Sequence, residues 1–282
     1  MSKEMKAIKG FFQIRKALGL SRFGRKAKPS AKPTRSLLAN THFTSSFDFG
    51  FELNEISPKT DYDKVIIYLH GGGFVNPIAT QHWQLIEKLA LMANARVLVP
   101  RYGLAPHHDV ADALEFVSKV IGYAKSFGKE IILMGDSAGG GLAVSSIQQL
   151  GLHNEISKLV LISPWLDSDF THPGLAEVLK HDPWLIPESL RRIAAVWSGD
   201  DNHQDERVSP VRGELSGFPK TLLFMGGWDI LLFDARWFYE KAVAADVDID
   251  YRELDQALHV YPLLPTPEGT LAREQILDFL AG

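Results

Sequence analysis

The sequence predicts an α/β fold in which helices cover both faces of a mostly parallel β-sheet. Short runs rich in Val, Ile and Leu alternate with longer segments whose apolar residues recur at helical spacing, and this alternation is typical of such a sheet. The 282 residues are 45% hydrophobic and 23% charged, which is ordinary usage for a globular protein with a sizeable core. Cys is absent, so disulfides and thiolate metal sites are excluded.

Predicted strands and helices follow one another along most of the chain. The segments expected to be strands are 47–53, 65–69, 95–100, 130–135, 158–163, 220–226 and 247–254. The segments expected to be helices are 80–93, 110–127, 138–151, 234–245 and 268–280. Residues 165–208 break this order, because they hold two short helical patterns, at 174–181 and 187–198, and no convincing strand. We interpret them as an insertion over the carboxyl edge of the sheet, where parallel sheets gather their ligand chemistry.

The N-terminal segment differs from the rest of the chain in charge. Residues 1–46 contain eleven Lys or Arg and one acidic residue, Glu4, although the whole chain has a formal net charge of −4. An amphipathic helix is predicted over 7–20, followed by a Pro-interrupted connector at 21–35. We interpret this arm first as a lid over a catalytic domain at 47–282. Peripheral contact with an anionic membrane is the alternative, and binding to nucleic acid is not expected.

No targeting or membrane-spanning segment is recognised in the sequence. No apolar run reaches the roughly 18 residues that a spanning helix needs. Gln13 and Arg15 interrupt the N-terminal apolar residues where a signal peptide would be continuous. The absence of Cys is compatible with a reducing compartment, and we expect a cytoplasmic protein that uses neither metal nor cofactor.

The stretch GDSAGG at 135–140 carries the first chemical signal. Gly135, Ser137 and Gly139 fit G-x-S-x-G, and the motif follows a predicted strand and opens a predicted helix, as a nucleophile turn requires. Small residues permit the tight turn that holds the serine hydroxyl out from the sheet. A serine hydroxyl is a weak nucleophile at neutral pH, so the turn is useful only with a base and with oxyanion donors nearby.

Three further stretches could supply those groups. HGGGF at 70–74 follows a predicted strand, and its consecutive glycines expose backbone N–H groups of the kind an oxyanion pocket needs. Asp229 and His259 each follow a later predicted strand. The chain order Ser137, Asp229, His259 is that of a hydrolase triad, and we expect the three side chains to converge at one edge of the sheet.

With these motifs the sequence resembles the hormone-sensitive-lipase-like family of α/β-hydrolase carboxylesterases. The shared motifs are HGGGF (70–74), YGLAP (102–106), GDSAGG (135–140), SPW (163–165), the Ser209-Pro210 pair, Asp229 and His259. The resemblance implies an α/β-hydrolase fold with a mostly parallel eight-stranded sheet. It also implies a helical cap built from the N-terminal arm and the insertion at 165–208.

The resemblance further implies a role for each matched residue. Ser137 is the nucleophile, His259 the general base and then acid, and Asp229 the group that orients the imidazole. The N–H groups of Gly72, Gly73 and Ala138 form the oxyanion hole. The substrate pocket is expected to include Phe74, Trp165 and Trp228, the two tryptophans because they flank predicted strand ends.

Some positions depart from the family pattern or compete with these assignments. The Glu that usually follows LAP is replaced here by His107, and the His107-His108-Asp109 run is interpreted as solvated surface, not as a metal site. Asp234 is a competitor for Asp229, and Asp167 is a weaker one.

The sequence therefore predicts a serine carboxylesterase that hydrolyses small-molecule esters with short acyl chains, from acetyl to about hexanoyl. A membrane-recruited lipase and a small-ligand receptor on the same fold are the alternatives. A homo-oligomer is left open.

Overall fold

The computed structural model describes residues 1–18, 29–200 and 202–282, and its centre is one β-sheet. Within the described residues the sheet has eight strands, in the order β1-β2-β4-β3-β5-β6-β7-β8. They are β1 (Thr41–Ser46), β2 (Glu52–Pro58), β3 (Lys64–Leu69), β4 (Ala95–Arg101), β5 (Glu130–Asp136), β6 (Lys158–Ile162), β7 (Lys220–Gly226) and β8 (Ile249–Leu254). The strands β3 to β8 run parallel, and β2 joins them antiparallel to β4. This arrangement confirms the predicted fold class.

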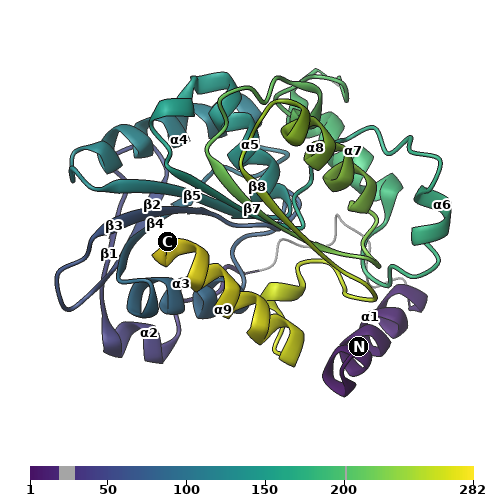
Figure 1. Cartoon of the computed structure of the whole chain (residues 1–282), viewed down its shortest axis with the longest axis horizontal. Coiled ribbons are helices and arrows are strands. Elements are labelled where there is room, and N and C mark those ends of the chain that lie inside the picture. Colours follow the sequence, from purple (N-terminus) through teal and green to yellow (C-terminus); the bar gives the residue numbers. More distant parts are fainter. Residues whose placement is uncertain (19–28, 201) are drawn as a thin grey trace.

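Helices cover the sheet on both faces (Figure 1). They are α1 (Lys3–Ala17), α2 (Arg35–Asn40), α3 (Thr80–Met92), α4 (Val110–Lys125), α5 (Ala138–Leu150), α6 (Leu175–Val178), α7 (Pro187–Ser198), α8 (Leu232–Ala244) and α9 (Pro267–Ala281). Side chains alternate between the faces along each strand, so Val65 and Ile67 join the core under α4 and α5, whereas Ile66 and Tyr68 join the core under α3 and α9. Burial on both faces explains why the parallel strands are continuous apolar runs.

The strand predicted at 47–53 is wrong. Residues 47–51 form the bend of a hairpin, in which β1 and β2 pair antiparallel with Ser46 opposite Leu53. The ring of Phe47 is 69% exposed at this bend. The alternation of FDFGFEL thus arises from a turn in which Phe47 is exposed while Phe49 and Phe51 pack against the core. The polar sequence THFTSS forms the edge strand. The sheet therefore begins within the segment that was assigned to the arm.

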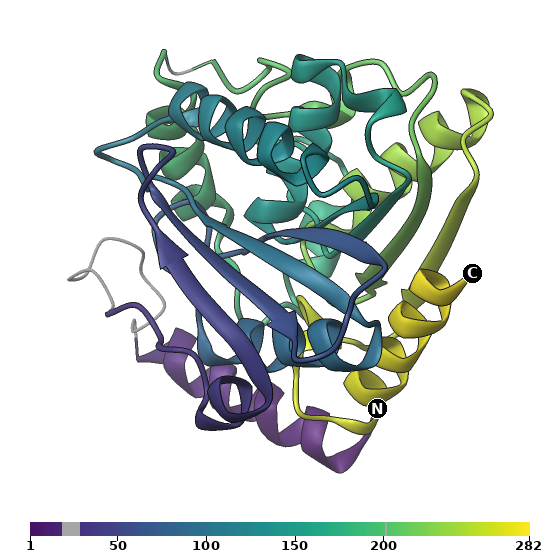
Figure 2. The same ribbon diagram turned by 90° about the vertical axis from the view of Figure 1, so that its left-hand side faces the viewer.

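The predicted N-terminal helix forms, with different ends. α1 begins at Lys3, where the Ser2 hydroxyl accepts a hydrogen bond from the N–H of Met5, and it ends at Ala17. The last two residues of the predicted helix and residues 21–28 of the connector lie outside the described residues. In Figure 2, α1 runs along the lower side of the molecule and begins beside the start of α9, where the backbone and hydroxyl of Ser2 donate hydrogen bonds to Glu268.

The insertion lies beyond the carboxyl ends of the central strands. α6 and α7 sit at the end of the sheet toward which β5, β6 and β7 point, on the side where α1 also lies (Figure 1). No helix in the described part of the chain is long and apolar enough to cross a membrane.

Candidate active site

A strained turn presents Ser137 at the end of β5. Ser137 has φ 50° and ψ −121°, a backbone conformation that residues other than glycine rarely adopt. Its N–H donates to the carbonyl oxygen of Ile162 at 2.9 Å, and its own carbonyl oxygen accepts from the N–H of Trp165 at 2.9 Å. Two backbone hydrogen bonds to the segment at the end of β6 therefore hold the turn in its strained conformation.

Close backbone contacts require glycine both within GDSAGG and at Gly141, the residue that follows it. A Cβ at Gly139 would collide with the carbonyl oxygen of Leu69 at the end of β3, and one at Gly141 would collide with that of Trp165 after β6. The start of α5 is thus packed directly between the ends of two strands. This packing explains why small residues stand where a strand-to-helix junction usually carries bulk.

His259 bridges Ser137 and Asp229. Its Nε2 lies 3.0 Å from the Ser137 Oγ, and its Nδ1 lies 2.7 Å from the Asp229 Oδ2. Asp229 is fully buried, and only 4% of His259 is exposed. Because a carboxylate can only accept, Nδ1 carries the proton, which leaves Nε2 of the neutral ring free to accept from the serine hydroxyl. The three side chains meet at the carboxyl ends of β5, β7 and β8.

The environment of His259 favours its protonated form. Burial alone would lower the pKa of the imidazole, but the charge of Asp229, its hydrogen bond and the charges of Asp182 and Asp136 outweigh this effect. The pKa of His259 is therefore raised. A base with a raised pKa accepts a proton readily, so the site is suited to remove the proton of Ser137 during an attack on a carbonyl carbon.

The loop that carries His259 is anchored to the strand end beside it. Val260 has φ 48°, and its N–H donates to the Ser163 Oγ at 3.0 Å. Ser163 is fully buried, and its own N–H donates to the carbonyl oxygen of Phe224 on β7. Ser163 thus fixes the backbone next to the imidazole. The sequence contained the SPW motif but gave no indication of this contact.

The glycine loop after β3 offers backbone donors. Gly72 has φ 130° and Gly73 has φ 59°, conformations that favour glycine. No acceptor in the described residues partners the N–H groups of Gly72, Gly73 or Ala138. Ala138 is the first residue of α5, so its N–H also lies at the positive end of the helix dipole.

The carboxylate of Asp136 fixes the start of the glycine loop through hydrogen bonds. Its Oδ1 accepts from the N–H of Gly71 at 2.9 Å and from the hydroxyl of Tyr68 at 2.7 Å, and its Oδ2 lies 3.2 Å from the Nε2 of His82. The Nδ1 of His82 accepts from the N–H of Ala79, so the ring donates to Asp136 through Nε2. Burial would raise the pKa of Asp136, but the electrostatic interaction with His82 and the hydrogen bonds from His82, Tyr68 and Gly71 lower it below its usual value.

Comparison with known proteins gives these features a family context. A sequence profile of the α/β-hydrolase fold matches residues 66–263. An esterase of Acinetobacter venetianus is 34% identical over 209 residues, which cover 72% of this chain and 69% of that protein. The chain belongs to the α/β-hydrolase family. The esterase LipU of Mycobacterium tuberculosis is 30% identical to this hydrolase over 238 residues, and the match covers 80% of each chain.

Solved structures also resemble this hydrolase over nearly its whole length. An esterase from the bacterial hormone-sensitive lipase family aligns with a TM-score of 0.82 at 29% identity, and the match covers 99% of this chain and 98% of that one. A double mutant of the esterase E40 aligns with a TM-score of 0.83 at 29% identity and the same coverage. The resemblance to hormone-sensitive-lipase-like proteins that was predicted from the motifs is thereby confirmed.

Asp234, the first competitor of Asp229, lies inside α8. It is buried, and burial, followed by the charges of Asp167 and Asp229, raises its pKa well above the usual value for a carboxyl group. A carboxyl group that is kept neutral cannot stabilise an imidazolium by its charge. The Nδ1 of His259 contacts Asp229 instead.

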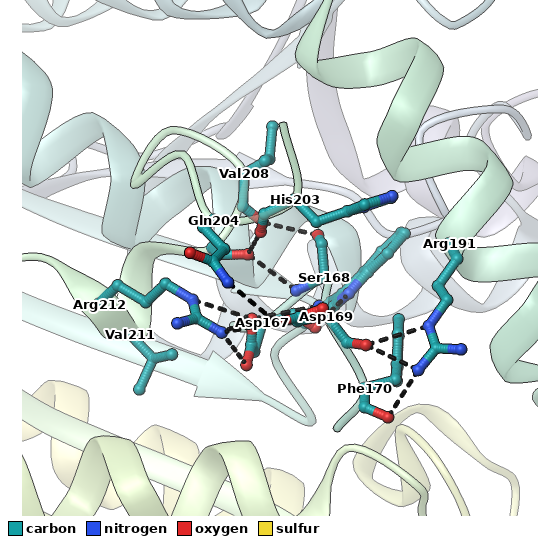
Figure 3. A network of polar contacts seen from close by, with 12 residues as sticks. Asp167, Ser168, Asp169, Phe170, Arg191, His203, Gln204, Val208, Val211 and Arg212 are labelled. Atoms are coloured by element: carbon teal, nitrogen blue, oxygen red, sulfur yellow. Dashed lines mark hydrogen bonds and ion pairs between the residues drawn. The ribbon is translucent and has the colours of Figure 1, made fainter. Parts of the chain in front are cut away.

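Asp167, the second competitor, belongs to a polar network at the base of the insertion (Figure 3). The guanidinium of Arg212 contacts the carboxylates of Asp167 at 3.0 Å and Asp169 at 3.3 Å. Arg191 on α7 donates to the carbonyl oxygens of Asp169 and Phe170. The network therefore fastens the insertion to the segment that leads into β7, and Asp167 is paired with an arginine.

Two of the three predicted pocket residues lie in a buried aromatic cluster. Phe74 stacks on Trp197 with ring centroids 4.2 Å apart and lies 5.6 Å from Trp165, which in turn lies 6.0 Å from Phe170. Since Phe74 follows the glycine loop directly and the N–H of Trp165 bonds to Ser137, this cluster adjoins the nucleophile turn.

Trp228, the third predicted pocket residue, is half-buried beneath α1. The ammonium group of Lys9 lies 3.5 Å from the centroid of its ring. Trp184, which was not among the three predicted pocket residues, lies beside the catalytic base, because its ring meets that of His259 edge-on at 5.5 Å.

Asp182 was not singled out from the sequence. It lies in the insertion, is buried, and accepts a hydrogen bond from the N–H of Ile230, the residue after Asp229. In the sequence, the one indication of a buried role for Asp182 is that it directly precedes the apolar residues Pro183 and Trp184. The spacing of motifs could not predict its contact with the turn after β7, because the two segments are distant in the chain.

Proposed function

We propose that this hydrolase, a carboxylic ester hydrolase by family, is a serine carboxylesterase for small esters with short acyl chains, from acetyl to about hexanoyl. The observation that carries this proposal is the continuous chain of hydrogen bonds from Ser137 through His259 to Asp229. Such a chain is useful for acyl transfer, because it activates the hydroxyl and stabilises the imidazolium that forms.

The proposed reaction has two halves. In the first, His259 Nε2 takes the hydroxyl proton as the Ser137 Oγ attacks the ester carbonyl carbon, and the N–H groups of Gly72, Gly73 and Ala138 stabilise the oxyanion. The alcohol then leaves with the proton from His259, which gives an acyl-enzyme. In the second half, water attacks the acyl carbon by the same route, and the acid leaves as the serine is regenerated.

The preference for short chains rests on the aromatic side chains near the nucleophile turn. Phe74 and Trp165 are buried, and the ring of Phe74 packs against those of Trp165 and Trp197, so a long acyl chain on that side would have to displace rings from the core. Trp228, half-buried under Lys9, is proposed to line the entrance.

The test of the function is hydrolysis of p-nitrophenyl butyrate by the wild type and by Ser137→Ala. We expect the variant to lose several orders of magnitude in kcat, with an unchanged thermal melt, and Ser145→Ala to serve as an active control because Ser145 is a buried serine elsewhere on α5. More than a few per cent residual activity in Ser137→Ala would refute the nucleophile. A small-ligand receptor, by contrast, would bind esters without turnover and would resist labelling by an organophosphate.

One observation favours recruitment to lipid as a second role. Phe11 and Ile14 on α1 and Leu18 at its C-terminal cap recur at helical spacing, and they are 56%, 63% and 65% exposed. The arm that carries them is basic, whereas the rest of the chain is acidic, so an anionic lipid surface is a better partner for this face than a second copy with the same charge.

Vesicle sedimentation tests this second role. Wild type is expected to bind vesicles that contain phosphatidylglycerol and not vesicles of phosphatidylcholine alone, and F11S/I14S is expected to lose that binding while retaining hydrolysis of the soluble ester. Equal sedimentation of both proteins would rule out recruitment through this face. Dimers of wild type in light scattering that F11S/I14S abolishes would assign the face to a second copy instead.

A further inference from the structure

A second carboxylate, Asp182, is buried beside the turn that carries Asp229. Its Oδ1 accepts hydrogen bonds from the N–H groups of Trp184 at 2.7 Å and Leu185 at 2.9 Å, and its Oδ2 accepts from the N–H of Ile230 at 3.0 Å. Three backbone donors therefore compensate for the burial of this side chain. Two of them belong to its own loop, and the third belongs to the turn after β7.

The backbone amides of that turn are divided between two carboxylates. Asp182 accepts from the N–H of Ile230, and Asp229 Oδ1 accepts from the N–H of Leu231 at 3.0 Å, which leaves Asp229 Oδ2 for His259. If Asp182 were absent, the N–H of Ile230 would be buried without this partner and could compete for Asp229. Such competition would rotate the carboxylate away from the imidazole.

We propose that Asp182 is a positioning residue that fixes the turn of Asp229 and connects it to the cap. The proposal rests on the proposed function, because it assigns to Asp182 an effect on the triad that the function requires. Asp182 acts through Asp229 and the backbone of its turn. It makes no direct contact with the reacting atoms.

The connection to the cap runs through α1. The ammonium group of Lys16 donates to the carbonyl oxygen of Asp182 at 2.8 Å. Phe12 stacks on Trp184 with ring centroids 4.1 Å apart and planes 15° apart, and Trp184 in turn meets His259 edge-on. Docking of α1 therefore holds the loop of Asp182 and Trp184 against both the acid and the base of the triad.

The charge of Asp182 also acts on His259. The charged groups that face Asp182 are Asp229, His259 and Lys16, and the exposed His181 precedes it in the chain. Burial, and then the charge of Asp229, raises the pKa of Asp182 to about 6. When Asp182 is ionised, its charge raises the pKa of His259. The base thus gains a second anionic neighbour as the pH rises above about 6.

The deciding experiment is the pH profile of Asp182→Asn. We expect kcat for p-nitrophenyl butyrate to fall by about 10–100-fold, the range for a lost hydrogen bond to a buried charge, with KM changed less than about twofold. The acidic limb of kcat/KM is expected to move to lower pH, because the pKa of His259 falls. Loss of activity at every pH with an unmoved limb would leave Asp182 a merely structural residue and overturn the proposal.

A matched pair of variants on α1 tests the connection without touching the buried carboxylate. Phe12→Ala removes the ring that stacks on Trp184, whereas Gln13→Ala changes the exposed residue that follows it on α1. We expect Phe12→Ala to reduce kcat several-fold and to move the acidic limb in the same direction as Asp182→Asn. Gln13→Ala is expected to leave both unchanged, and identical profiles for the two variants would contradict the connection.

A direct titration keeps this inference separate from the proposed function. The pKa of His259, measured by NMR in wild type and Asp182→Asn, is expected to be lower in the variant, whether or not the protein hydrolyses the ester. If wild type has no esterase activity, the proposed function fails while the titration still decides the role of Asp182. If Asp182→Asn does not fold, the titration of Phe12→Ala against Gln13→Ala decides it.

Discussion

The hydroxyl of Ser163 accepts a hydrogen bond from the backbone N–H of Val260 at 3.0 Å, although 97 residues separate them along the chain. This contact ties the end of β6 to the loop that carries His259. The imidazole is therefore held from two sides, by Asp229 through its ring and by Ser163 through its backbone.

Ser163→Ala is predicted to reduce turnover without altering substrate binding. The variant leaves the N–H of Val260 buried without its acceptor, which costs about 1–3 kcal/mol and loosens the loop of His259. We expect kcat to fall about tenfold with KM nearly constant, as measured on p-nitrophenyl butyrate. Ser145→Ala is the control, since the buried Ser145 Oγ has no hydrogen-bond partner among the described residues.

The pH dependence of the wild type follows from the raised pKa of His259. The imidazole acts as a base only when it is neutral, so kcat/KM is expected to fall as the pH decreases through that pKa, which lies above the usual value of about 6.5. Asp229→Asn removes the adjacent charge and is expected to lower the pKa and to reduce kcat by about 10⁴-fold. An acidic limb at the same pH in both proteins would show that Asp229 does not set it.

Acyl preference is predicted to depend on Phe74. Phe74→Leu makes room for roughly one methylene group, and each buried methylene contributes about 0.8 kcal/mol. We therefore expect kcat/KM for octanoyl relative to butyryl p-nitrophenyl esters to rise about fourfold. Phe47→Ala, at a ring that is 69% exposed, should leave the ratio unchanged. A wild type that prefers palmitate to butyrate would contradict the short-chain assignment itself.

The buried Asp234 is predicted to lower the stability of the fold as the pH rises above about 4. Its pKa is raised well above the usual value, so the folded protein keeps it neutral while the unfolded chain ionises it above pH about 4. Stability is therefore lost as the pH rises from about 4 toward the folded-state pKa. Asp234→Asn cannot ionise, and its Tm relative to wild type should increase from pH 5 to pH 8. The exposed Asp278→Asn should show no such trend.

The sequence predicted the parts of the fold that depend on local pattern. Apolar runs such as VIIYL and IILM located the parallel strands, because burial on both faces leaves a continuous apolar signal. The pattern failed at residues 41–53. There the edge strand β1 is polar because it faces solvent, and the aromatic residues lie in a bend. Edge strands and exposed turns carry no apolar pattern from which their register could be inferred.

The candidate site was predictable where a backbone requirement left a motif. The glycines around Ser137 and the glycines after His70 mark turns that only small residues can adopt. The supporting contacts left no such trace. Ser163 and Asp182 act through single hydrogen bonds to distant backbone amides, and only the folded chain brings these partners together.

The close packing at the start of α5 bears on how this enzyme can be altered. Carbonyl oxygens of Leu69 and Trp165 occupy the space that a side chain at Gly139 or Gly141 would need, so a library that randomises this turn would consist mostly of misfolded proteins. The insertion reaches the same reaction centre through a side chain, because the ring of Trp184 meets that of His259. Efforts to change the substrate range should therefore keep the turn and Asp182 unchanged and mutate the other residues of the insertion.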